Sequence, residues 1–553
     1  MRIAAIDVGS NSIHMVVAQV ESDGRFRVLD RAKEMVRLGR RSLNSGRLSS
    51  EAMTAGVRTL AAFRTLAERQ GVVRFNAVAT SAVREASNGG DFIQRVKDEV
   101  GLRVKVIPGR EEARLVYLGV RHAIDLRKEP TLIVDVGGGS VELILVDEEK
   151  PVVLHSLKIG VARLSEKFLH TDPPTGKELG HLNTYLEAEL EPILNRVRKR
   201  QVKRVVGTSG TLLNLVAIAG HARGEPPDNH LNNFSVSSDE IARVRRLVIK
   251  SDREERLRIK GLDAKRVDLI GAGACLADCI LRLVGAQELV ACTWALREGV
   301  LLDFISRHPK GIEETERFAE PRRRSVARLA RHLGETGEHG PHVAHLALQL
   351  FDQLQTALAL PDETREWLEC AAWLHDVGHH IGHKDHQRHS YYLITNGELL
   401  GFRHDELEII GLTARYHQKA TPKDADDGYA ALSKADRRTV RALSAILRIA
   451  DGMDRSHYGV VRDVGAQRRN GRLTVQLLTA GDDVALEIWE SQRRAGLLAE
   501  VLGTEIDFQV VIQPRGGQVT RQAGVLTRVE CGIRIATESR FNQAALPGLR
   551  IRR

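Results

Sequence analysis

The chain has 553 residues, a formal net charge of +10 at pH 7 and an apolar content of 42%. At about 150 residues per domain this length predicts three or four domains, and the apolar content excludes wholesale disorder. The charge fits a polyanionic partner such as nucleic acid, polyphosphate or nucleotide, but also a generally basic soluble surface.

The five cysteines and the apolar runs indicate where the protein works. The cysteines are odd in number and form no Cys-x-x-Cys pair, which argues against a disulfide framework or a zinc knuckle. A reducing cytosol is their natural compartment. No apolar run approaches the roughly 20 residues that span a bilayer. We therefore expect a cytoplasmic protein with no membrane partner.

The first 305 residues alternate between expected strands and helices, which predicts an α/β fold. Asp23 and Gly24 mark a hairpin turn, and Ser49 is placed to cap the first long helix. The expected strands cover residues 1–20, 25–31, 72–80, 131–136, 141–146 and 202–206, and the expected helices cover residues 49–70, 111–124 and 179–197.

Two glycine turns dominate this region. Residues 7–12 read Asp-Val-Gly-Ser-Asn-Ser, residues 135–140 read Asp-Val-Gly-Gly-Gly-Ser, and each run follows an apolar strand. A third turn, residues 207–211, opens a helix. Glycines permit close backbone approach, and amides at a helix start can bind phosphate. One such turn alone is usually an ordinary β-turn, but the pair predicts a phosphate site between two related lobes, where Asp7 and Asp135 suit Mg²⁺.

Three glutamates near these turns are candidates for acid–base chemistry. Glu111 and Glu112 open a helix between the two turns, and Glu142 follows the second turn. A carboxylate beside a bound phosphate can orient or deprotonate water. The helix dipole explains an acid at either Glu111 or Glu112, so the pattern alone does not choose between them.

Five segments together resemble the exopolyphosphatase / guanosine pentaphosphate phosphohydrolase family: residues 4–17, 109–115, 135–142, 207–211 and 295–301. The resemblance implies a duplicated, actin-like and sugar-kinase-like fold with its site between two lobes. It implies that Glu112 is the catalytic base and that Glu142 helps to bind metal and water, with Asp135 as a further magnesium ligand. The phosphate-binding residues implied are Asp7, Gly9, Ser10, Asn11, Ser12, Arg84, Asp135, Gly137, Gly138, Gly139, Ser140, Gly207, Ser209 and Gly210.

Residues 318–460 are almost entirely helix-like and rich in histidine. The order of His339, the pair His375-Asp376, and Asp451 resembles the HD metal-dependent phosphohydrolase superfamily. This resemblance implies a divalent metal such as Mn²⁺, Fe²⁺, Zn²⁺ or magnesium. His389 and His417 are candidates to line the pocket or to hold a second ion.

The chain after residue 460 changes character again. Residues 473–478 and 484–489 alternate like strands, residues 491–502 are expected to be helical, and residues 514–553 carry eight arginines and two acids. The expected organisation is two actin-like lobes over residues 1–124 and 125–305, a helical HD-type domain over 306–460, a small α+β domain over 461–513, and a basic tail over 514–553.

Two basic clusters fit a channel for a long polyanion, although each alone also fits a solvated face. They comprise Arg196, Arg198, Lys199, Arg200, Lys203 and Arg204 in one case and residues 322–324, Arg328 and Arg331 in the other. The aromatic content of 4% gives poor support for nucleic acid as a partner, since stacking platforms are scarce.

The favoured function is a Mg²⁺-dependent exopolyphosphatase that releases terminal phosphate from inorganic polyphosphate. Hydrolysis of guanosine pentaphosphate in the same site is the close alternative. A kinase of the same superfamily and a non-enzymatic polyphosphate or nucleotide sensor are alternatives of other classes. The oligomeric state stays open, with a homodimer as the candidate assembly.

Overall fold

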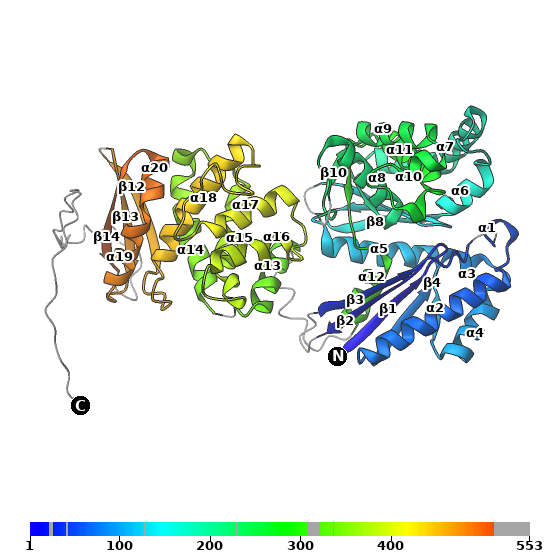
Figure 1. The fold of residues 1–553 in the computed structure, drawn as a ribbon, viewed down its shortest axis with the longest axis horizontal. Helices are drawn as coiled ribbons and strands as arrows, with labels where there is room; N and C mark the ends of the chain where they lie inside the picture. The colour runs from blue at the N-terminus through cyan, green and yellow to red at the C-terminus, as the bar shows by residue number, and fades with distance from the viewer. Residues whose placement is uncertain are drawn as a thin grey trace.

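The computed structural model describes residues 1–513 apart from 21–25, 40–41, 127–128, 228–229, 308–320, 336 and 470. Two α/β lobes lie at one end of the molecule, a helical region follows, and a three-stranded sheet covers the far side of that region (Figure 1). The basic tail expected over residues 514–553 and the turn at Asp23-Gly24 lie outside the described residues.

Lobe I is built on a five-stranded sheet in the order β3-β2-β1-β4-β5. Strands β1 and β2 form an antiparallel hairpin around the first glycine turn, whereas β4 runs parallel to β1. The strands are β1 (Arg2–Val8), β2 (Ile13–Val20), β3 (Phe26–Glu34), β4 (Arg74–Ala79) and β5 (Val104–Val106), and the helices are α1 (Ser42–Ser45), α2 (Ser50–Arg69), α3 (Ser81–Glu85), α4 (Gly89–Val100) and α5 (Gly109–Ala123). As expected, the Ser49 side chain caps α2 by accepting a hydrogen bond from the Ala52 amide.

Lobe II repeats this topology. Its sheet has the order β10-β11-β9-β6-β7-β8, so β6, β7, β8, β9 and β11 take the places of β1 to β5. The strands are β6 (Thr131–Val136), β7 (Val141–Asp147), β8 (Lys150–Leu157), β9 (Arg204–Thr208), β10 (Ser235–Ser237) and β11 (Glu288–Ala291); the helices are α6 (Val161–Phe168), α7 (Gly176–Arg198), α8 (Ser209–Arg223), α9 (Ser238–Lys250), α10 (Arg253–Leu257), η1 (Ala264–Arg266) and α11 (Ile270–Val284). The helix that follows, α12 (Leu296–Ser306), packs on β1 and β2 of lobe I. The repeated strand order confirms the expectation of two related lobes.

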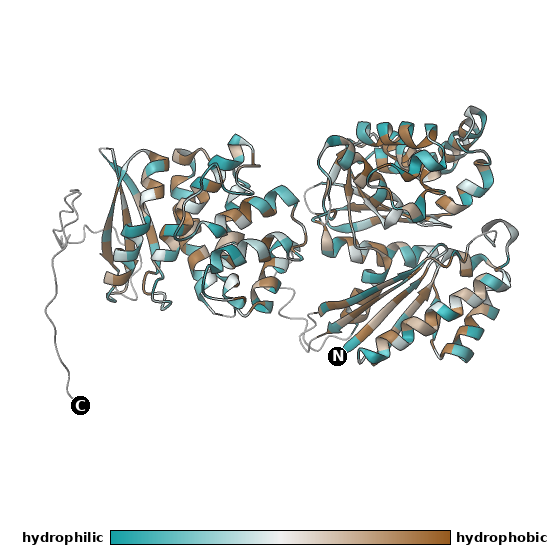
Figure 2. Cartoon of the chain, in the orientation of Figure 1, coloured by the Kyte–Doolittle hydropathy of each residue, from teal (hydrophilic) through white to brown (hydrophobic). Residues whose placement is uncertain are grey.

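Both sheets are buried between helices, which explains the apolar runs of their strands (Figure 2). Residues 131–136 are buried at every position, and Ile3, Ala4, Ala5 and Ile6 are fully inaccessible. Helices α5 and α12 pack against each other between the lobes (Figure 1). The shared packing places both glycine turns at one junction.

The helical region begins with α13 (Pro321–His332). It continues with α14 (His339–Leu358), α15 (Thr364–Leu374), η3 (Val377–His380), α16 (His386–Asn396), α17 (His404–Arg415) and α18 (Lys434–Gly452). Three of these elements begin or end beside residues of the expected metal constellation, since His339 opens α14, His375 follows α15 and Asp451 lies near the end of α18.

The last described region corrects one expectation. Residues 484–489 do not form a strand, because Val484 is the N-cap of α19 (Ala485–Arg494) and residues 485–489 form its first turns. Val484 and Ile488 are four residues apart and both pack on the core, a spacing that suits a helix as well as the alternation suits a strand. The Asp483 carboxylate also accepts a hydrogen bond from the Ala485 amide, which supports the helix start.

The small sheet shares its core with the helical region. Strand β13 (Arg472–Thr479) lies between β12 (Asp463–Arg469) and β14 (Glu505–Ile512), and α20 (Gly496–Leu502) follows α19. Buried Leu473, Val475 and Leu477 belong to one apolar cluster with Leu443, Ile446 and other residues of α18. The sheet and the helices therefore bury one continuous apolar core.

The arginines of α13 hold the helical region against its neighbours. Arg322 forms ion pairs with Glu366 and Glu406, and Arg324 donates a hydrogen bond to the His122 carbonyl of α5. Arg323 pairs with Glu369. This basic cluster therefore serves packing between elements, because carboxylates and carbonyls already take up most of its guanidinium groups.

No helix among the described residues is long and apolar enough to cross a membrane.

Candidate functional site

A cavity of about 280 Å³ lies between the two lobes. The glycine turns meet there, since a Cβ built on Gly138 would lie 3.3 Å from the Asn11 Cβ. Among the residues predicted from the sequence, those that line it are Asp7, Gly9, Ser10, Asn11, Ser12, Glu112, Asp135, Gly137, Gly138, Ser140, Glu142, Ser209 and Gly210. Segments more than 100 residues apart thus converge on one cleft.

Three predicted residues lie next to the cleft without lining it. Arg84 stands behind Glu112, where its guanidinium donates to the Glu112 carboxylate at 2.9 Å and to the Ile107 carbonyl at 2.7 Å. The Gly139 carbonyl accepts from the Gly160 amide, and Gly207, the penultimate residue of β9, lies close to the side chains of Leu212 and Leu289. These residues support the turns and the base candidate from behind.

Several lining residues were not anticipated, notably His14, Lys33, Arg266 and Arg297. A Cβ on Gly210 would lie 1.8 Å from Nη2 of Arg266, so the glycine leaves room for the guanidinium at its place in the cleft. Lys33 lies in β3 and Arg266 in η1, and neither segment has a phosphate-loop pattern from which the residue could have been predicted. Arg297 falls within a segment of the family resemblance, and that was its only signal.

Four buried carboxyl groups share the cleft, and burial disfavours their charge. Burial and the neighbouring Glu112 and Asp135 raise the pKa of Asp7 to about 8. Burial raises the pKa of Glu112 to about 7, although Arg84 opposes the rise, and it raises the pKa of Asp135 to about 6. The pKa of Glu142 also stands well above its usual value because of burial and the nearby Glu112.

This carboxylate cluster fits a hard cation. Oδ1 of Asp7 and Oδ1 of Asp135 are buried without a hydrogen-bond partner. Magnesium binds through one or two carboxylates together with water and substrate phosphates. Buried oxygens of this kind would be satisfied, and their charge balanced, by such an ion.

Cationic side chains line the same cleft. The positive charges of Arg266 and Arg297 contribute to lowering the pKa of Lys33, after burial. Burial and the same arginines lower the pKa of His14 to about 3, so its ring is neutral. An acidic cluster and a cationic group within one cavity suit a phosphate chain that bears a bound metal at one end.

The helical region holds a second constellation. His339 Nε2 lies 3.5 Å from Asp451 Oδ1 and 3.9 Å from Asp376 Oδ2, and His375 Nε2 lies 3.6 Å and 3.7 Å from the same two oxygens. Nε2 of both histidines is buried without a hydrogen-bond partner. The structure thus brings the four predicted ligands together around one point.

The ring tautomers also suit a metal. His339 Nδ1 lies 2.7 Å from Asp454 Oδ2, and His375 Nδ1 lies 2.7 Å from the Ala372 carbonyl. These acceptors place a proton on Nδ1 and leave the Nε2 lone pair for a ligand. Burial lowers the pKa of His339, but hydrogen bonds to Asp451 and Asp454 outweigh burial and raise this pKa to about 10. In the absence of a cation, a proton on His339 would therefore take the place of the metal.

The other oxygen of Asp376 faces a second group of histidines. Asp376 Oδ1 lies 3.2 Å from His386 Nε2, 3.5 Å from His417 Nε2 and 3.7 Å from His379 Nε2. His417 therefore joins the constellation, whereas His389 belongs to none of the metal-capable groups found among the described residues. His386 and His379 were missed because five histidines crowd residues 379–389 and spacing alone does not rank them.

The small C-terminal region supports this constellation. Arg494 of α19 is buried and pairs with both Asp451 and Glu490. Its charge offsets the buried aspartate and fixes the carboxylate from behind. Residues of the last described region thus help to hold the predicted metal ligands.

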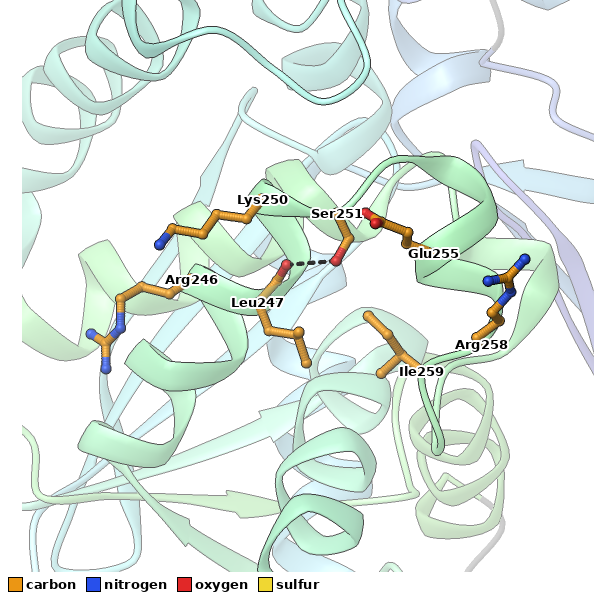
Figure 3. Close-up of a pocket in the computed structure, with 7 residues that line it drawn as sticks. All are labelled: Arg246, Leu247, Lys250, Ser251, Glu255, Arg258 and Ile259. Atoms are coloured by element: carbon orange, nitrogen blue, oxygen red, sulfur yellow. Dashed lines mark hydrogen bonds between the residues drawn. The ribbon is translucent and has the colours of Figure 1, made fainter.

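A further hollow on lobe II carries no comparable chemistry. Figure 3 shows Leu247 and Ile259 facing each other while Arg246, Lys250 and Arg258 point outwards. The Ser251 hydroxyl donates to the Leu247 carbonyl at 3.0 Å, and Glu255 belongs to the capping box of α10. No convergent polar groups remain there for a ligand.

Two glycine turns, acids and cations in a cleft between duplicated lobes define a phosphate-handling protein of the α/β class. The chain belongs to the Ppx/GppA phosphatase family, whose model matches residues 16–308, and residues 322–488 match Ppx/GppA phosphatase, domain III.

Similar proteins agree with this family. Exopolyphosphatase 1 of Mycobacterium leprae is 30% identical over 312 residues, which cover 56% of this chain and 91% of the relative. Exopolyphosphatase 1 of Mycobacterium tuberculosis is also 30% identical, over 56% of this chain and 90% of the relative. The crystal structure of an exopolyphosphatase from Cytophaga hutchinsonii is 31% identical and covers 56% of this chain and 98% of that chain, with a TM-score of 0.53.

Proposed function

We propose that the chain is an exopolyphosphatase that releases orthophosphate from the end of inorganic polyphosphate. The observation that carries the proposal is the convergence of both glycine turns, Glu112 and Glu142 on one cleft. Family membership and exopolyphosphatases among the relatives support the substrate class. We also propose that the duplicated lobes have an actin-like fold and that the protein is cytoplasmic.

The terminal phosphate would sit between the glycine turns. Backbone amides of the turns and the N-terminus of α8 provide donors for its oxygens. Lys33, Arg266 and Arg297 line the same cavity and would bind the phosphates that follow along the chain. We therefore propose that these cations of the cleft bind the polyphosphate, in place of the surface channel expected from the two basic clusters. In the second cluster, Arg322 and Arg323 already form ion pairs.

Glu112 is proposed as the base that takes a proton from the attacking water. A base works best when its pKa lies near the working pH, and burial has raised that of Glu112 to about 7. Arg84 holds the carboxylate in place from behind at 2.9 Å. Glu142 would orient the water, and its own carboxylate accepts a hydrogen bond from the Ser156 hydroxyl at 2.7 Å.

Asp135 and Glu142 would hold Mg²⁺, with Asp7 nearby. When bound, the ion would offset the negative charge that spreads over the phosphoryl oxygens in the transition state. The remaining chemistry falls to the turns, Glu112 and the cations of the cleft.

Guanosine pentaphosphate is the alternative substrate for the same site, because its terminal phosphate is also held by an anhydride bond. Phosphate release from long-chain polyphosphate and from guanosine pentaphosphate, measured side by side, tests the proposal. We expect the larger kcat/KM with polyphosphate. A larger value with the nucleotide would reassign the substrate while leaving the reaction unchanged.

We further propose an HD-type metal centre in the helical region, held by His339, His375, Asp376 and Asp451. The unpartnered Nε2 atoms of the two histidines carry this proposal. Mn²⁺, Fe²⁺ and Zn²⁺ suit mixed imidazole and carboxylate ligands. Hydrolysis of a phosphoester at this centre is its candidate activity, and metal analysis of the purified full chain tests its occupancy.

A further inference from the structure

Ser12 of the first glycine turn is joined to a chain of polar side chains that reaches across the cleft. Its Oγ lies 2.7 Å from His14 Nε2, and His14 Nδ1 lies 2.7 Å from Nη1 of Arg297. Ser12, His14 and Arg297 all line the cavity. This series of hydrogen bonds thus links β2 of lobe I to α12, because Arg297 lies 283 residues after His14 in the sequence.

The far end of this chain is anchored. Nε of Arg297 donates to Glu298 Oε1 at 2.8 Å, and Glu298 is completely buried. The other Glu298 oxygen accepts a hydrogen bond from the Ala295 amide at 3.0 Å. The guanidinium is therefore held in one orientation toward the His14 ring.

The chemistry of the Arg297 guanidinium decides which atom donates in each hydrogen bond of this series. A guanidinium has donors only, so Nδ1 of His14 must accept and cannot carry a proton. The ring proton then lies on Nε2 and is donated to Ser12 Oγ. Burial of His14 and the nearby Lys33 and Arg266 also favour the neutral ring.

The hydroxyl proton of Ser12 remains available as a hydrogen-bond donor. Its oxygen accepts from His14, so its own hydroxyl proton must be donated elsewhere. Among the described residues no acceptor for that proton is found, and the residue borders the cavity. An oxygen of a bound anion would supply the missing acceptor.

We infer that His14 and Arg297 are positioning residues, which fix the Ser12 hydroxyl as a donor to a phosphate oxygen of the substrate. The inference rests on the proposed function, because it takes the cleft as the phosphate site. A donor that is oriented before the substrate binds needs no reorganisation when it binds, and it favours an anionic oxygen over a group that itself donates. Its loss should cost roughly tenfold to a hundredfold in kcat/KM.

A double-mutant cycle in the full chain tests the coupling. Ser12→Ala, His14→Leu and the double variant are compared by phosphate release from polyphosphate, with melting temperatures to verify folding. If His14 acts through Ser12, the double variant loses about as much kcat/KM as Ser12→Ala alone. Losses that multiply would overturn the inference, because His14 would then contact substrate itself or serve only the fold.

His14→Gln is the matched conservative variant. Its amide oxygen can accept from Arg297 and its amide nitrogen can donate to Ser12, so we expect kcat/KM well above that of His14→Leu. Equal losses of kcat/KM in His14→Gln and His14→Leu would count against the positioning of Ser12 by His14.

The tautomer can be measured without any activity. NMR of ring nitrogens in histidine-labelled protein, with His14→Gln to assign the signals, should show the His14 proton on Nε2 only. In Arg297→Met, which removes the donor to Nδ1, the ring should populate both tautomers. A proton on Nδ1 in the wild type would refute the inference. Failure of the wild type to release phosphate from either substrate would instead refute the proposed function and leave this readout intact.

Discussion

At the scale of single residues, Glu112 and Glu111 offer a matched comparison. They are adjacent in sequence, yet Glu112 lines the cleft whereas Glu111 does not and pairs with Arg114 at 2.8 Å. The sequence pattern alone does not distinguish the two glutamates, whereas the fold places only Glu112 at the cleft. Their different surroundings make the assignment of the base testable with two variants of the same chemistry.

Replacing Glu112 by Gln should lower kcat by ~10²–10⁴-fold, because the water loses its proton acceptor. Substrate binding should change little, since the amide keeps the shape of the carboxylate. Steady-state phosphate release gives kcat, and equilibrium binding of polyphosphate gives the affinity. Glu111→Gln is the control and should remain close to wild type. Near-normal turnover in Glu112→Gln, with a large loss in Glu111→Gln, would exchange the two roles.

The Arg84 guanidinium should set the pH dependence of the reaction. Its charge and hydrogen bond lower the pKa of Glu112 against the effect of burial. In Arg84→Met the pKa of Glu112 therefore rises, and the deprotonated base forms only at higher pH. We expect the acidic limb of the kcat/KM profile to move to higher pH, while Arg84→Lys keeps it close to wild type. An acidic limb that stays in place in Arg84→Met would exclude Glu112 as the titrating base.

At the scale of elements, the ends of α14, α15 and α18 assemble the predicted metal centre. We expect the full chain to purify with Mn²⁺, Fe²⁺ or Zn²⁺ and Asp376→Ala to lose that transition metal, because Asp376 faces both groups of histidines. Metal analysis measures the occupancy. His389→Ala is the control, since His389 lies outside those groups, and it should retain the metal. Equal metal content in all three proteins would place the ion elsewhere.

The shared core of α18 and the small sheet makes a second prediction at this scale. A fragment of residues 306–460 would expose the side chains that pack on Leu473, Val475 and Leu477 and would lose the Arg494 partner of Asp451. It should therefore melt at a lower temperature than a fragment of residues 306–513, or aggregate. Thermal unfolding of the two fragments checks this. Equal melting temperatures would show that the sheet is an independent unit.

At the scale of the whole molecule, the sequence predicted the lobes well because glycine turns and buried strands are local patterns. It anticipated both turns, Glu112 and Glu142, and the four histidine and aspartate residues that converge in the helical region. It missed Lys33 and Arg266, because nothing local distinguishes a cation that enters a cleft from one on the surface. It assigned residues 484–489 to a strand, because a short apolar run satisfies both periodicities and only the packing of Ile488 on the core decides between them.

The division of the chain also depends on long-range contacts. A composition change near residue 460 suggested a separate small domain, whereas the apolar core continues across that point. Arg494 lies 43 residues from Asp451, and no sequence pattern links the two. Such contacts explain why the ligands of the helical region could be named from the sequence while their supporting residues could not.

In the proposed reaction, water attacks the terminal phosphorus of polyphosphate in the cleft between the lobes. Hydrolysis of polyphosphate in water labelled with heavy oxygen tests this step, with mass analysis of the first orthophosphate released from each chain, because attack at the penultimate phosphorus would leave only that first product unlabelled. Attack at the terminal phosphorus predicts one solvent oxygen in each orthophosphate released, and a strong loss of release in Glu112→Gln. An unlabelled first orthophosphate, with the heavy oxygen left at the end of the shortened chain, would show that water attacks the penultimate phosphorus instead.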